Sequence, residues 1–217
     1  MKVQAILSDL RRNRDFMSQV VAWESLPATP AATAPFPPAL PAGLLTALQR
    51  RGISHLYTHQ EIAISSVFSG ADVVIATPTA SGKSLCYTIP VVSHLLADPT
   101  GRALYLFPTK ALAHDQLAET QDLINAGDLP LAAYSYDGDT PQSKRRQVRQ
   151  SPGIIFSNPD MLHSGILPNH PGWRALFSNL KFVVLDEIHT YRGIFGSHVG
   201  NVIRRLQRLC TFYGSSP

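Results

Sequence analysis

Cysteine is nearly absent from this chain of 217 residues. The two that occur, Cys86 and Cys210, lie far apart in the sequence and show no metal-ligand spacing. Their number and spacing exclude a disulfide framework and a zinc site built on cysteines. Because few, unpaired cysteines are typical of proteins from a reducing compartment, we expect a cytoplasmic location.

Long hydrophobic runs are also absent. The longest apolar stretches, such as "FVVL" from Phe182, are far too short to span a membrane. The N-terminal "MKVQAILSDLRRNRD" becomes charged before the core of a signal peptide could form, so we expect no membrane segment. The formal net charge is only +4, which tolerates a polyanionic partner without requiring one. Partners must therefore be identified from motifs.

The chain is predicted to consist of an N-terminal extension, residues 1–52, and one globular domain, residues 53–217. The extension begins with a short amphipathic pattern within residues 1–23. It continues with a proline-rich stretch, 27–41, whose composition is typical of an extended and semi-rigid tether. A short helix follows, and Gly52 is expected to end it as a C-cap.

Strand-like apolar runs alternate with helical patterns from Leu56 onward. Such runs, when helices separate them, indicate a parallel sheet covered on both faces. A last helix from about His198 has one apolar stripe, with Arg204, Arg205 and Arg208 turned away from it. The fold class is therefore α/β, a mostly parallel sheet with helices on both faces. The predicted strands are 72–77, 103–108, 131–136, 153–158 and 181–187.

The stretch "TPTASGKS", from Thr77 to Ser84, joins the first predicted strand to a helical pattern. This is the context of a phosphate-binding loop, in which backbone N–H groups at a helix start face an anion. Lys83 would reach the outer phosphates, and the Ser84 hydroxyl would ligate Mg²⁺. Since the standard signature has glycine where Thr77 stands, the loop by itself also fits a turn with a solvent-facing lysine.

A second motif, "DEIH", ends the last predicted strand. In a parallel sheet ligands bind at the carboxyl ends of strands, so this motif and the loop are expected to converge. Asp186 would hold Mg²⁺ through a water molecule, and Glu187 would orient and deprotonate the water that attacks the γ-phosphate. The alternative is that the two acids merely cap the next helix.

The order of the motifs resembles that of the superfamily 2 helicases of the DEAD/DEAH type. "LYTHQ" is similar to the adenine-reading Q motif, "TPTASGKS" to motif I, "FPTKALAHDQ" to motif Ia, "NPDM" to motif Ib and "DEIH" to motif II, over residues 56–189. Longer strings, such as "DEIHTYRGIFGSH", resemble the bacterial mitomycin-repair helicases and their fungal RecQ4-like relatives. The resemblance implies a RecA-like P-loop domain of an ATP-dependent DNA helicase for DNA repair, with 3′ to 5′ polarity, ATP and Mg²⁺ as cofactors and single-stranded DNA as partner.

The resemblance also assigns roles to individual residues of the nucleotide site. Gln60 would hydrogen-bond the adenine edge, and Tyr57 would either stack on the base or simply hold the helix start. The family loop commonly reads "TPTGSGK", so the one departure is Ala80, which predicts a negative φ there. The residues assigned to ATP are Tyr57, Gln60, Thr77, Pro78, Thr79, Ala80, Ser81, Gly82, Lys83 and Ser84; those assigned to catalysis are Lys83, Asp186, Glu187 and His189, with Ser84 and Asp186 on Mg²⁺.

Motifs Ia and Ib each place a helix start at the same edge of the predicted sheet. Thr109 is expected to be the N-cap of one helix, and Asn158, followed by Pro159, the N-cap of another. Free N–H groups at helix starts bind the phosphates of a single strand without reading its sequence, although plain capping leaves the same pattern. Together with the flanking Pro108 and Lys110, these residues are predicted to contact nucleic acid.

Three other segments have two readings each. In "YDGDT", Gly138 would let a nucleic-acid backbone approach closely, or the loop simply precedes a helix. The basic run 144–149 is favoured as a solvated helix face over an electrostatic footprint. After motif II, Tyr191 and Arg192 would contact DNA by stacking and by charge, while Phe195 would either stack or be buried under the last helix.

The chain ends at "CTFYGSSP", before the strand that carries motif III in the family. The resemblance places that strand between those of motifs I and II, so we expect an unpaired centre of the sheet. A second RecA-like domain would also be missing, and we expect an N-terminal fragment that turns ATP over poorly by itself. Two other functions stay open: a motor that moves on duplex DNA without separating strands, and a non-catalytic nucleic-acid-binding scaffold.

Overall fold

The computed structural model describes residues 3–27, 30–78 and 81–217. The chain forms two compact units, residues 1–32 and 33–217. The first unit contains two helices, α1 (Val3–Arg12) and α2 (Arg14–Ser18), and neither has a buried residue. The boundary after residue 52 stays a prediction, whereas the second unit seen here already begins at Thr33.

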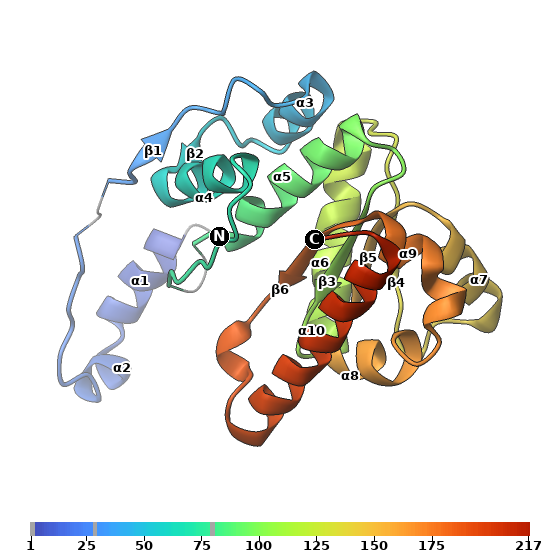
Figure 1. Cartoon of the computed structure of the whole chain (residues 1–217). Helices are drawn as coiled ribbons and strands as arrows, with labels where there is room; N and C mark the ends of the chain where they lie inside the picture. The colour runs from blue at the N-terminus through green and yellow to red at the C-terminus, as the bar shows by residue number, and fades with distance from the viewer. Residues whose placement is uncertain (1–2, 28–29, 79–80) are drawn as a thin grey trace. The chain divides into compact units, whose positions relative to one another are not determined.

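A four-stranded parallel sheet forms the centre of the second unit (Figure 1). Its spatial order is β4-β5-β3-β6, and a separate antiparallel pair, β1 with β2, precedes it in sequence. Four of the five predicted strands are therefore confirmed, as is the parallel sheet. The strands are β1 (Thr33–Ala34), β2 (Leu56–Tyr57), β3 (Arg102–Leu106), β4 (Ala133–Ser135), β5 (Gly153–Ser157) and β6 (Leu180–Leu185).

The fifth predicted strand, 72–77, is wrong: the structure has no strand there. A strand needs a neighbour to complete its ladder of hydrogen bonds, and apolar side chains alone do not supply one. Within the described residues, β6 pairs with β3 and with no strand on its other side. The segment is accordingly open to solvent, and Val74 is 82% exposed. The expectation of a gap in the sheet between the strands of motifs I and II stays a prediction, because the described residues directly before motif I form no strand.

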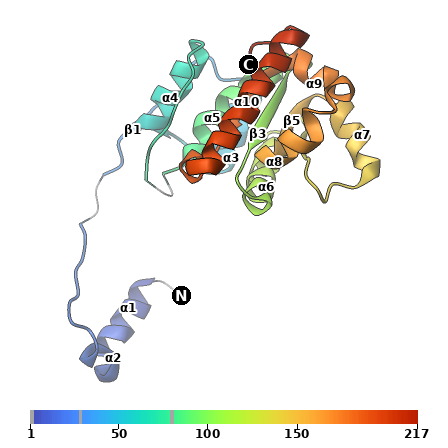
Figure 2. The same ribbon diagram turned by 60° about the horizontal axis from the view of Figure 1, so that its bottom comes forward.

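Helices cover both faces of the sheet, as predicted (Figures 1 and 2). Alternation along β3 divides the core: Tyr105 packs with α3, α5 and α6, whereas Leu104 and Leu106 pack with α9 and α10 on the opposite face. The helices on the Tyr105 side are α3 (Ala42–Arg50), α4 (Thr58–Phe68), α5 (Lys83–Ala97) and α6 (Lys110–Ala126). The remaining helical segments are α7 (Gln142–Gln150), α8 (Pro159–Met161), η1 (Leu162–Ile166), η2 (His170–Trp173), α9 (Arg174–Asn179), η3 (Ile188–Thr190) and α10 (Gly193–Tyr213).

Two predicted helix ends can be compared with the structure. Gly52 follows α3 with a φ of 76°, the left-handed conformation that a C-terminal glycine provides, so this prediction is confirmed. The last helix begins at Gly193, earlier than the predicted His198, because Arg192 already has the extended conformation of an N-cap. Arg205, which was predicted to turn away from the apolar stripe, is half-buried, and its guanidinium lies 2.8 Å from Nδ1 of His163.

Both cysteines are buried free thiols on helices of the second unit. Burial is the main cause that raises the pKa of Cys86 to about 11, and burial also raises the pKa of Cys210. None of the helices in the described part of the chain is both long and apolar enough to cross a membrane.

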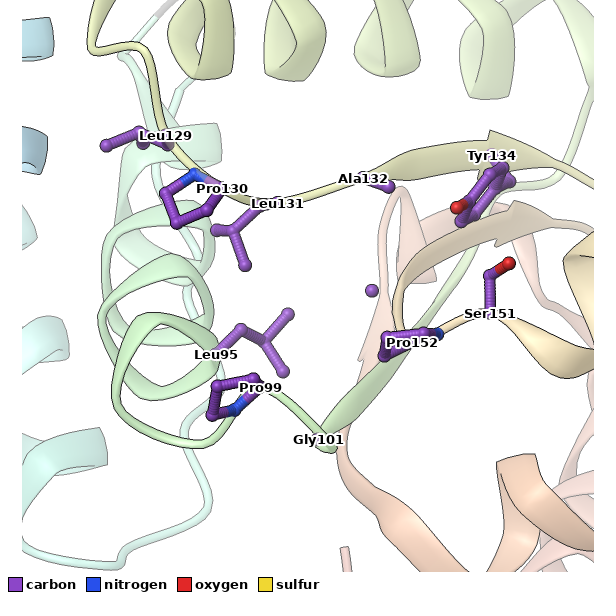
Figure 3. A pocket seen from close by; sticks show the side chains of 11 residues that line it. Leu95, Pro99, Gly101, Leu129, Pro130, Leu131, Ala132, Tyr134, Ser151 and Pro152 are labelled. Carbon is purple, nitrogen blue, oxygen red and sulfur yellow. The ribbon is translucent and has the colours of Figure 1, made fainter.

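A cavity of about 350 Å³ opens at the amino ends of the strands, between the end of α5 and the segments that lead into β4 and β5 (Figure 3). Leu95 and Pro99 line it at the end of α5, Leu131 lines it from the segment before β4, and Pro152 lines it from the segment before β5. Since ligands of parallel sheets bind at the carboxyl ends of strands, this cavity lies at the edge opposite to the predicted site.

Candidate nucleotide and nucleic-acid site

The carboxyl ends of three neighbouring strands are joined by backbone hydrogen bonds just beyond the sheet. The N–H of Phe107 donates to the carbonyl of Ser157 at 3.0 Å, and the N–H of Asp186 donates to that of Leu106 at 3.0 Å. Motifs Ia, Ib and II each follow one of these strands. The structure thus confirms that they leave the sheet at one edge.

The phosphate-loop segment leads into α5, whose N-cap is Gly82 with a left-handed φ of 75°. The Lys83 ammonium donates to the carbonyls of Thr77 and Pro78 at 3.0 and 3.1 Å. The hydroxyls of Thr77 and Ser81 lie 2.6 Å apart. The lysine therefore folds back over its own loop, and a phosphate would replace carbonyl oxygens as its partners. Thr79 and Ala80 lie outside the described residues, and with them the prediction about φ at Ala80.

Gln60 fastens this loop to the segment before α4. Its Nε2 donates to the Gly82 carbonyl at 2.8 Å, and its Oε1 accepts the N–H of Tyr57 at 2.8 Å. The side chain is 2% exposed, so both ends of its amide are used within the protein. A contact with adenine would have to replace one of these bonds, and it stays a prediction.

The contact with Gln60 also explains why position 82 is a glycine. A Cβ at this position would lie 2.6 Å from Nε2 of Gln60, and its left-handed φ is already strained for any other residue. Tyr57 is the N-cap of α4, as its second interpretation predicted. The residue is 44% exposed and its ring stacks on His59, while a contact with a base stays a prediction.

The carboxylates of motif II do not cap a helix, which was their alternative reading. Glu187 precedes the short η3 with a left-handed φ of 51°, and it makes no capping hydrogen bond with its side chain. Its Oε2 lies 3.1 Å from Nδ1 of His189 instead. Asp186 accepts the N–H of Glu187 on Oδ1 at 2.7 Å and the hydroxyl of Tyr87 on Oδ2 at 2.8 Å.

Tyr87 is a site residue that the sequence analysis missed. The signal was available, because Tyr87 stands one helical turn after Lys83 and so on the same face of α5. The residues that Tyr87 contacts could not be predicted in the same way, since they come from other elements of the fold. Within the described residues no group of three or more His, Cys, Asp or Glu side chains could hold a metal ion alone.

The two predicted N-caps beside motifs Ia and Ib are confirmed. The Thr109 hydroxyl accepts the N–H of Leu112 at 3.3 Å, and the Asn158 side chain accepts the N–H of Met161 at 2.8 Å, with Pro159 as the first helical residue. Capping satisfies one N–H group in each case, while the other N–H groups of the first turn keep no helical partner. Anion binding and capping are therefore compatible here.

The "YDGDT" loop is built around Asp137, which is buried. Its carboxylate accepts the N–H of Asp139 at 2.8 Å, the Ser135 hydroxyl at 2.9 Å and a ring nitrogen of His114 at 2.9 Å. Burial opposes the ionised form of Asp137, but the hydrogen bonds from His114, Ser135 and the Asp139 N–H prevail and lower its pKa. The loop is therefore held by its own hydrogen bonds, and it directly precedes α7 as the second reading predicted. A contact of Gly138 with nucleic acid stays a prediction.

Lys110 of motif Ia reaches the same loop. Its ammonium donates to the Asp139 carboxylate at 2.7 Å, and this hydrogen bond is the main cause that raises the pKa of Lys110. A Cβ on Gly138 would lie 3.4 Å from the Lys110 ammonium. The structure thus brings the glycine and the motif Ia lysine together, which the sequence analysis did not predict.

The prediction of a solvated face fails at Arg145 within the basic run 144–149, where Val148 is buried as well. The Arg145 guanidinium donates to the carbonyls of Thr140 and Asp137 at 3.0 Å each, and it lies over the Tyr136 ring at 5.2 Å. The prediction was therefore wrong for Arg145, which closes the "YDGDT" loop from the side of α7.

The segment after motif II places an aromatic pair at the start of α10. The rings of Tyr191 and Phe195 lie 5.6 Å apart, and Phe195 is 39% exposed, so its predicted alternative of burial under the last helix is wrong. Burial, and then the charges of Asp186 and Asp160, raise the pKa of Tyr191 to about 12. Tyr191 therefore lies near the acids of motifs II and Ib. Arg192 donates to the His189 carbonyl at 2.7 Å.

The order and the geometry of these motifs can be compared with known proteins. The family model for the DEAD/DEAH box helicase matches residues 57–216, well over half of the chain. The chain belongs to the DEAD/DEAH box helicase family. The family model thus confirms the resemblance that the motifs indicated.

Individual relatives place this DEAD/DEAH box chain more narrowly. The uncharacterized ATP-dependent helicase YprA of Bacillus subtilis is 50% identical over 212 residues, which cover 98% of this chain and 28% of YprA. The ATP-dependent helicase HRQ1 of Saccharomyces cerevisiae is 47% identical over 176 residues, 76% of this chain and 16% of HRQ1. The chain therefore spans less than a third of the length of these relatives.

Solved structures agree on the fold. The crystal structure of the helicase MrfA bound to DNA and AMPPNP is 49% identical, with a TM-score of 0.89, and the match covers 100% of this chain and 30% of that one. The helicase Mss116p, bound to single-stranded RNA and AMP-PNP, has a TM-score of 0.67 over 79% of this chain and 35% of its own. At 21% identity, that second likeness shows the fold alone.

Proposed function

We propose that this chain is the first RecA-like motor domain of an ATP-dependent DNA helicase, which acts in DNA repair with 3′ to 5′ polarity. One observation carries the proposal: the phosphate-loop lysine, the motif II acids and the capped helix starts of motifs Ia and Ib all border one sheet and its carboxyl edge. The relatives support it, since YprA and HRQ1 are ATP-dependent helicases and MrfA was crystallised with DNA and AMPPNP.

The residues at the nucleotide site fit ATP with Mg²⁺. A hydroxyl and a carboxylate, those of Ser84 and Asp186, are oxygen ligands of the kind that Mg²⁺ prefers, and the nucleotide phosphates would complete the set. Bound there, the ion would neutralise charge that develops on the phosphates. Lys83 would exchange two carbonyl partners for phosphate oxygens, with Gly82 held by Gln60 at the helix start that faces them.

Glu187 is the proposed general base. Its backbone has a left-handed conformation, and its N–H group donates to the Asp186 carboxylate. These two features fix the direction of the Glu187 side chain relative to Asp186. The carboxylate would orient a water and accept its proton as the γ-phosphate is attacked. His189, 3.1 Å from Glu187, would hold that carboxylate in place.

Single-stranded DNA would be gripped through its backbone. The starts of α6 and α8, with Thr109 and Asn158 as caps, would offer N–H groups to phosphates, and Pro108 and Pro159 would fix the chain direction at each start. Lys110 and Gly138 lie beside one another and would contact the next part of the strand. Tyr191 and Arg192 would add stacking and charge.

Activity of the whole protein would require a second RecA-like domain, which supplies arginine fingers in this type of motor. We place the protein in the cytoplasm, and the two buried free cysteines support that compartment.

The test is single-stranded-DNA-stimulated ATP hydrolysis by the full-length protein that contains these residues, with Lys83→Ala and Glu187→Gln as variants. We expect DNA to stimulate the wild type and both substitutions to remove most of the activity. Equal hydrolysis by all three proteins would refute the enzymatic function. Strand-separation assays on substrates with opposite overhangs would then decide between unwinding with 3′ to 5′ polarity and movement on duplex DNA alone.

A further inference from the structure

Tyr87 joins three elements at the nucleotide site. It stands on α5, half-buried, with its ring packed edge-on against Tyr105 at 5.3 Å between centroids. Its hydroxyl lies 2.8 Å from Oδ2 of Asp186, at the end of β6, and 3.2 Å from Oε1 of Gln116 on α6. Through one oxygen atom, the helix after the phosphate loop thus meets motif II and the helix of motif Ia.

The hydroxyl has a single hydrogen and two acceptors to choose from. A carboxylate is the stronger acceptor, and the Asp186 oxygen is also the nearer one, so Tyr87 donates to Asp186. The structure has Oε1 of Gln116 facing the phenol, and a half-turn of this amide would present its N–H group to the phenol oxygen instead, so that each donor would have one acceptor. In either orientation of the amide, Tyr87 stands between Gln116 and Asp186 in one chain of hydrogen-bonding groups.

Both oxygens of the Asp186 carboxylate are engaged, one of them by the Tyr87 hydroxyl. Asp186 has its other oxygen, Oδ1, engaged by the N–H of Glu187, so the carboxylate is held from both sides.

The hydrogen-bond chain ends at Gln116, on the helix α6 that begins at motif Ia. Gln116 stands about two turns, or roughly 10 Å, along α6 from the Thr109 cap. Ala113 and Leu123 of the same helix are buried in the core, so α6 is held to the sheet along its length. A shift at the start of α6 would consequently reach Gln116 as a shift of the whole helix.

We propose that Tyr87 is a positioning residue that holds the Asp186 carboxylate and, through Gln116, couples nucleic acid at the start of α6 to nucleotide at the phosphate loop. This inference rests on the proposed function, because it assigns a coupling to that same site. By linkage, strand binding then changes nucleotide affinity and nucleotide changes strand affinity by the same factor.

The experiment measures that factor by binding and not by turnover. A fluorescent, non-hydrolysable ATP analogue with Mg²⁺ is titrated into the full-length protein with and without a single-stranded oligo-dT, and the ratio of the two dissociation constants is the coupling factor. Wild-type coupling is expected in the range of about 5- to 150-fold. Tyr87→Phe keeps the ring and removes the donor, and we expect the factor to fall at least about fivefold or to vanish. We also expect the variant to require more Mg²⁺ for half-maximal binding of the analogue.

Gln116→Leu tests the other end of this hydrogen-bond chain. The substitution removes the Gln116 amide but leaves the contact between Tyr87 and Asp186 in place. It should reduce the coupling factor, and the double variant should lose no more than Tyr87→Phe alone, because both act through one chain. Thermal unfolding of each variant shows whether it is folded at the titration temperature.

Two matched controls separate coupling from packing. Tyr105→Phe removes a neighbouring buried hydroxyl that makes no hydrogen bond with Tyr87, Gln116 or Asp186. Gln121→Leu removes an amide of the same helix that contacts the Ala133 carbonyl instead. Both controls should keep the wild-type coupling factor.

The inference is overturned if Tyr87→Phe keeps a coupling factor within about twofold of wild type, or if the two substitutions reduce it independently of each other. It is also overturned if the controls lose coupling to the same extent. Failure of the proposed function looks different: the wild type itself would not bind the analogue in a manner that depends on Lys83.

Discussion

The two edges of the central sheet differ in kind. At the carboxyl edge the chain places lysine, aspartate, glutamate and histidine side chains that are engaged in polar contacts with their own segment or with a neighbouring element. At the amino edge the same strands are entered through proline and glycine, around a cavity with leucine and proline walls. The proposed chemical groups lie at the first edge, whereas the cavity at the second edge is lined by residues to which no chemical role is assigned. Substitutions at the two edges should therefore separate activity from stability.

The largest expected effect is at the carboxyl edge. Glu187→Gln should reduce the rate of ATP hydrolysis by about 10²- to 10⁴-fold, the usual contribution of a general base. Nucleotide binding should persist, because Lys83 and the loop are unchanged. Steady-state ATPase assays and analogue titrations on the full-length protein measure both quantities. Loss of binding in parallel with loss of turnover would mean that Glu187 is structural.

Gly153→Ala is the counterpart at the amino edge. Gly153 opens β5 with a φ of 123°, and a Cβ there would lie 2.1 Å from the Ala132 carbonyl oxygen. A strained conformation and a backbone clash should together lower the free energy of unfolding by about 3 kcal/mol or more. Denaturant unfolding measures this loss. The rate of ATP hydrolysis per folded molecule should stay at the wild-type value, and a large fall would contradict the separation of the two edges.

A smaller effect is expected at Asp137, which serves stability on the carboxyl edge. Its pKa is lower in the folded protein than the ordinary value of 3.8, so its contribution is complete above that pH and is lost as the pH falls below it. Asp137→Asn should cost about 1–3 kcal/mol near neutral pH and should weaken the acid dependence of unfolding. Denaturant titrations from neutral to acid pH compare the two proteins. An unchanged acid dependence would exclude Asp137 as its source.

The smallest effect should come from Lys110→Ala. The ammonium is exposed and paired with Asp139, so its removal should leave stability nearly unchanged. If Lys110 exchanges that partner for a phosphate, strand affinity should fall a few-fold, and the slope of log affinity against log salt should decrease by about 0.7. Fluorescence anisotropy with oligo-dT at several salt concentrations measures the slope. A slope equal to that of the wild type would show that Lys110 does not contact a phosphate of the strand.

Much of the fold followed from local patterns. Buried strands were recognisable because runs such as 103–108 and 153–158 are apolar on both faces, and the caps at Thr109 and Asn158 because their side chains act on the next turn. The run 72–77 has the same pattern but failed, since pairing depends on a neighbour that no local pattern reports. Residue propensity shows only that a segment's side chains fit the surface of a sheet. Whether the segment forms a strand depends on backbone hydrogen bonds to a neighbouring strand.

The site was predicted less completely, for the same reason. Lys83, Asp186 and Glu187 follow from motifs whose chemistry is local. Tyr87 and Arg145 were missed or misjudged because their partners lie on other elements and become visible only when the elements pack. The role of Gln60 was only partly accessible: its residue type suggests a bidentate contact, yet in this structure the contact is made with Tyr57 and Gly82.

The two buried thiols have a practical consequence. A thiol reacts as its thiolate, and Cys86, buried and with a pKa of about 11, offers almost none at neutral pH; Cys210 is buried as well. Maleimide dyes should therefore not react with these two residues while the domain is folded. A single cysteine introduced on an exposed helix position would then report the movements of this domain by fluorescence, without first rebuilding its core.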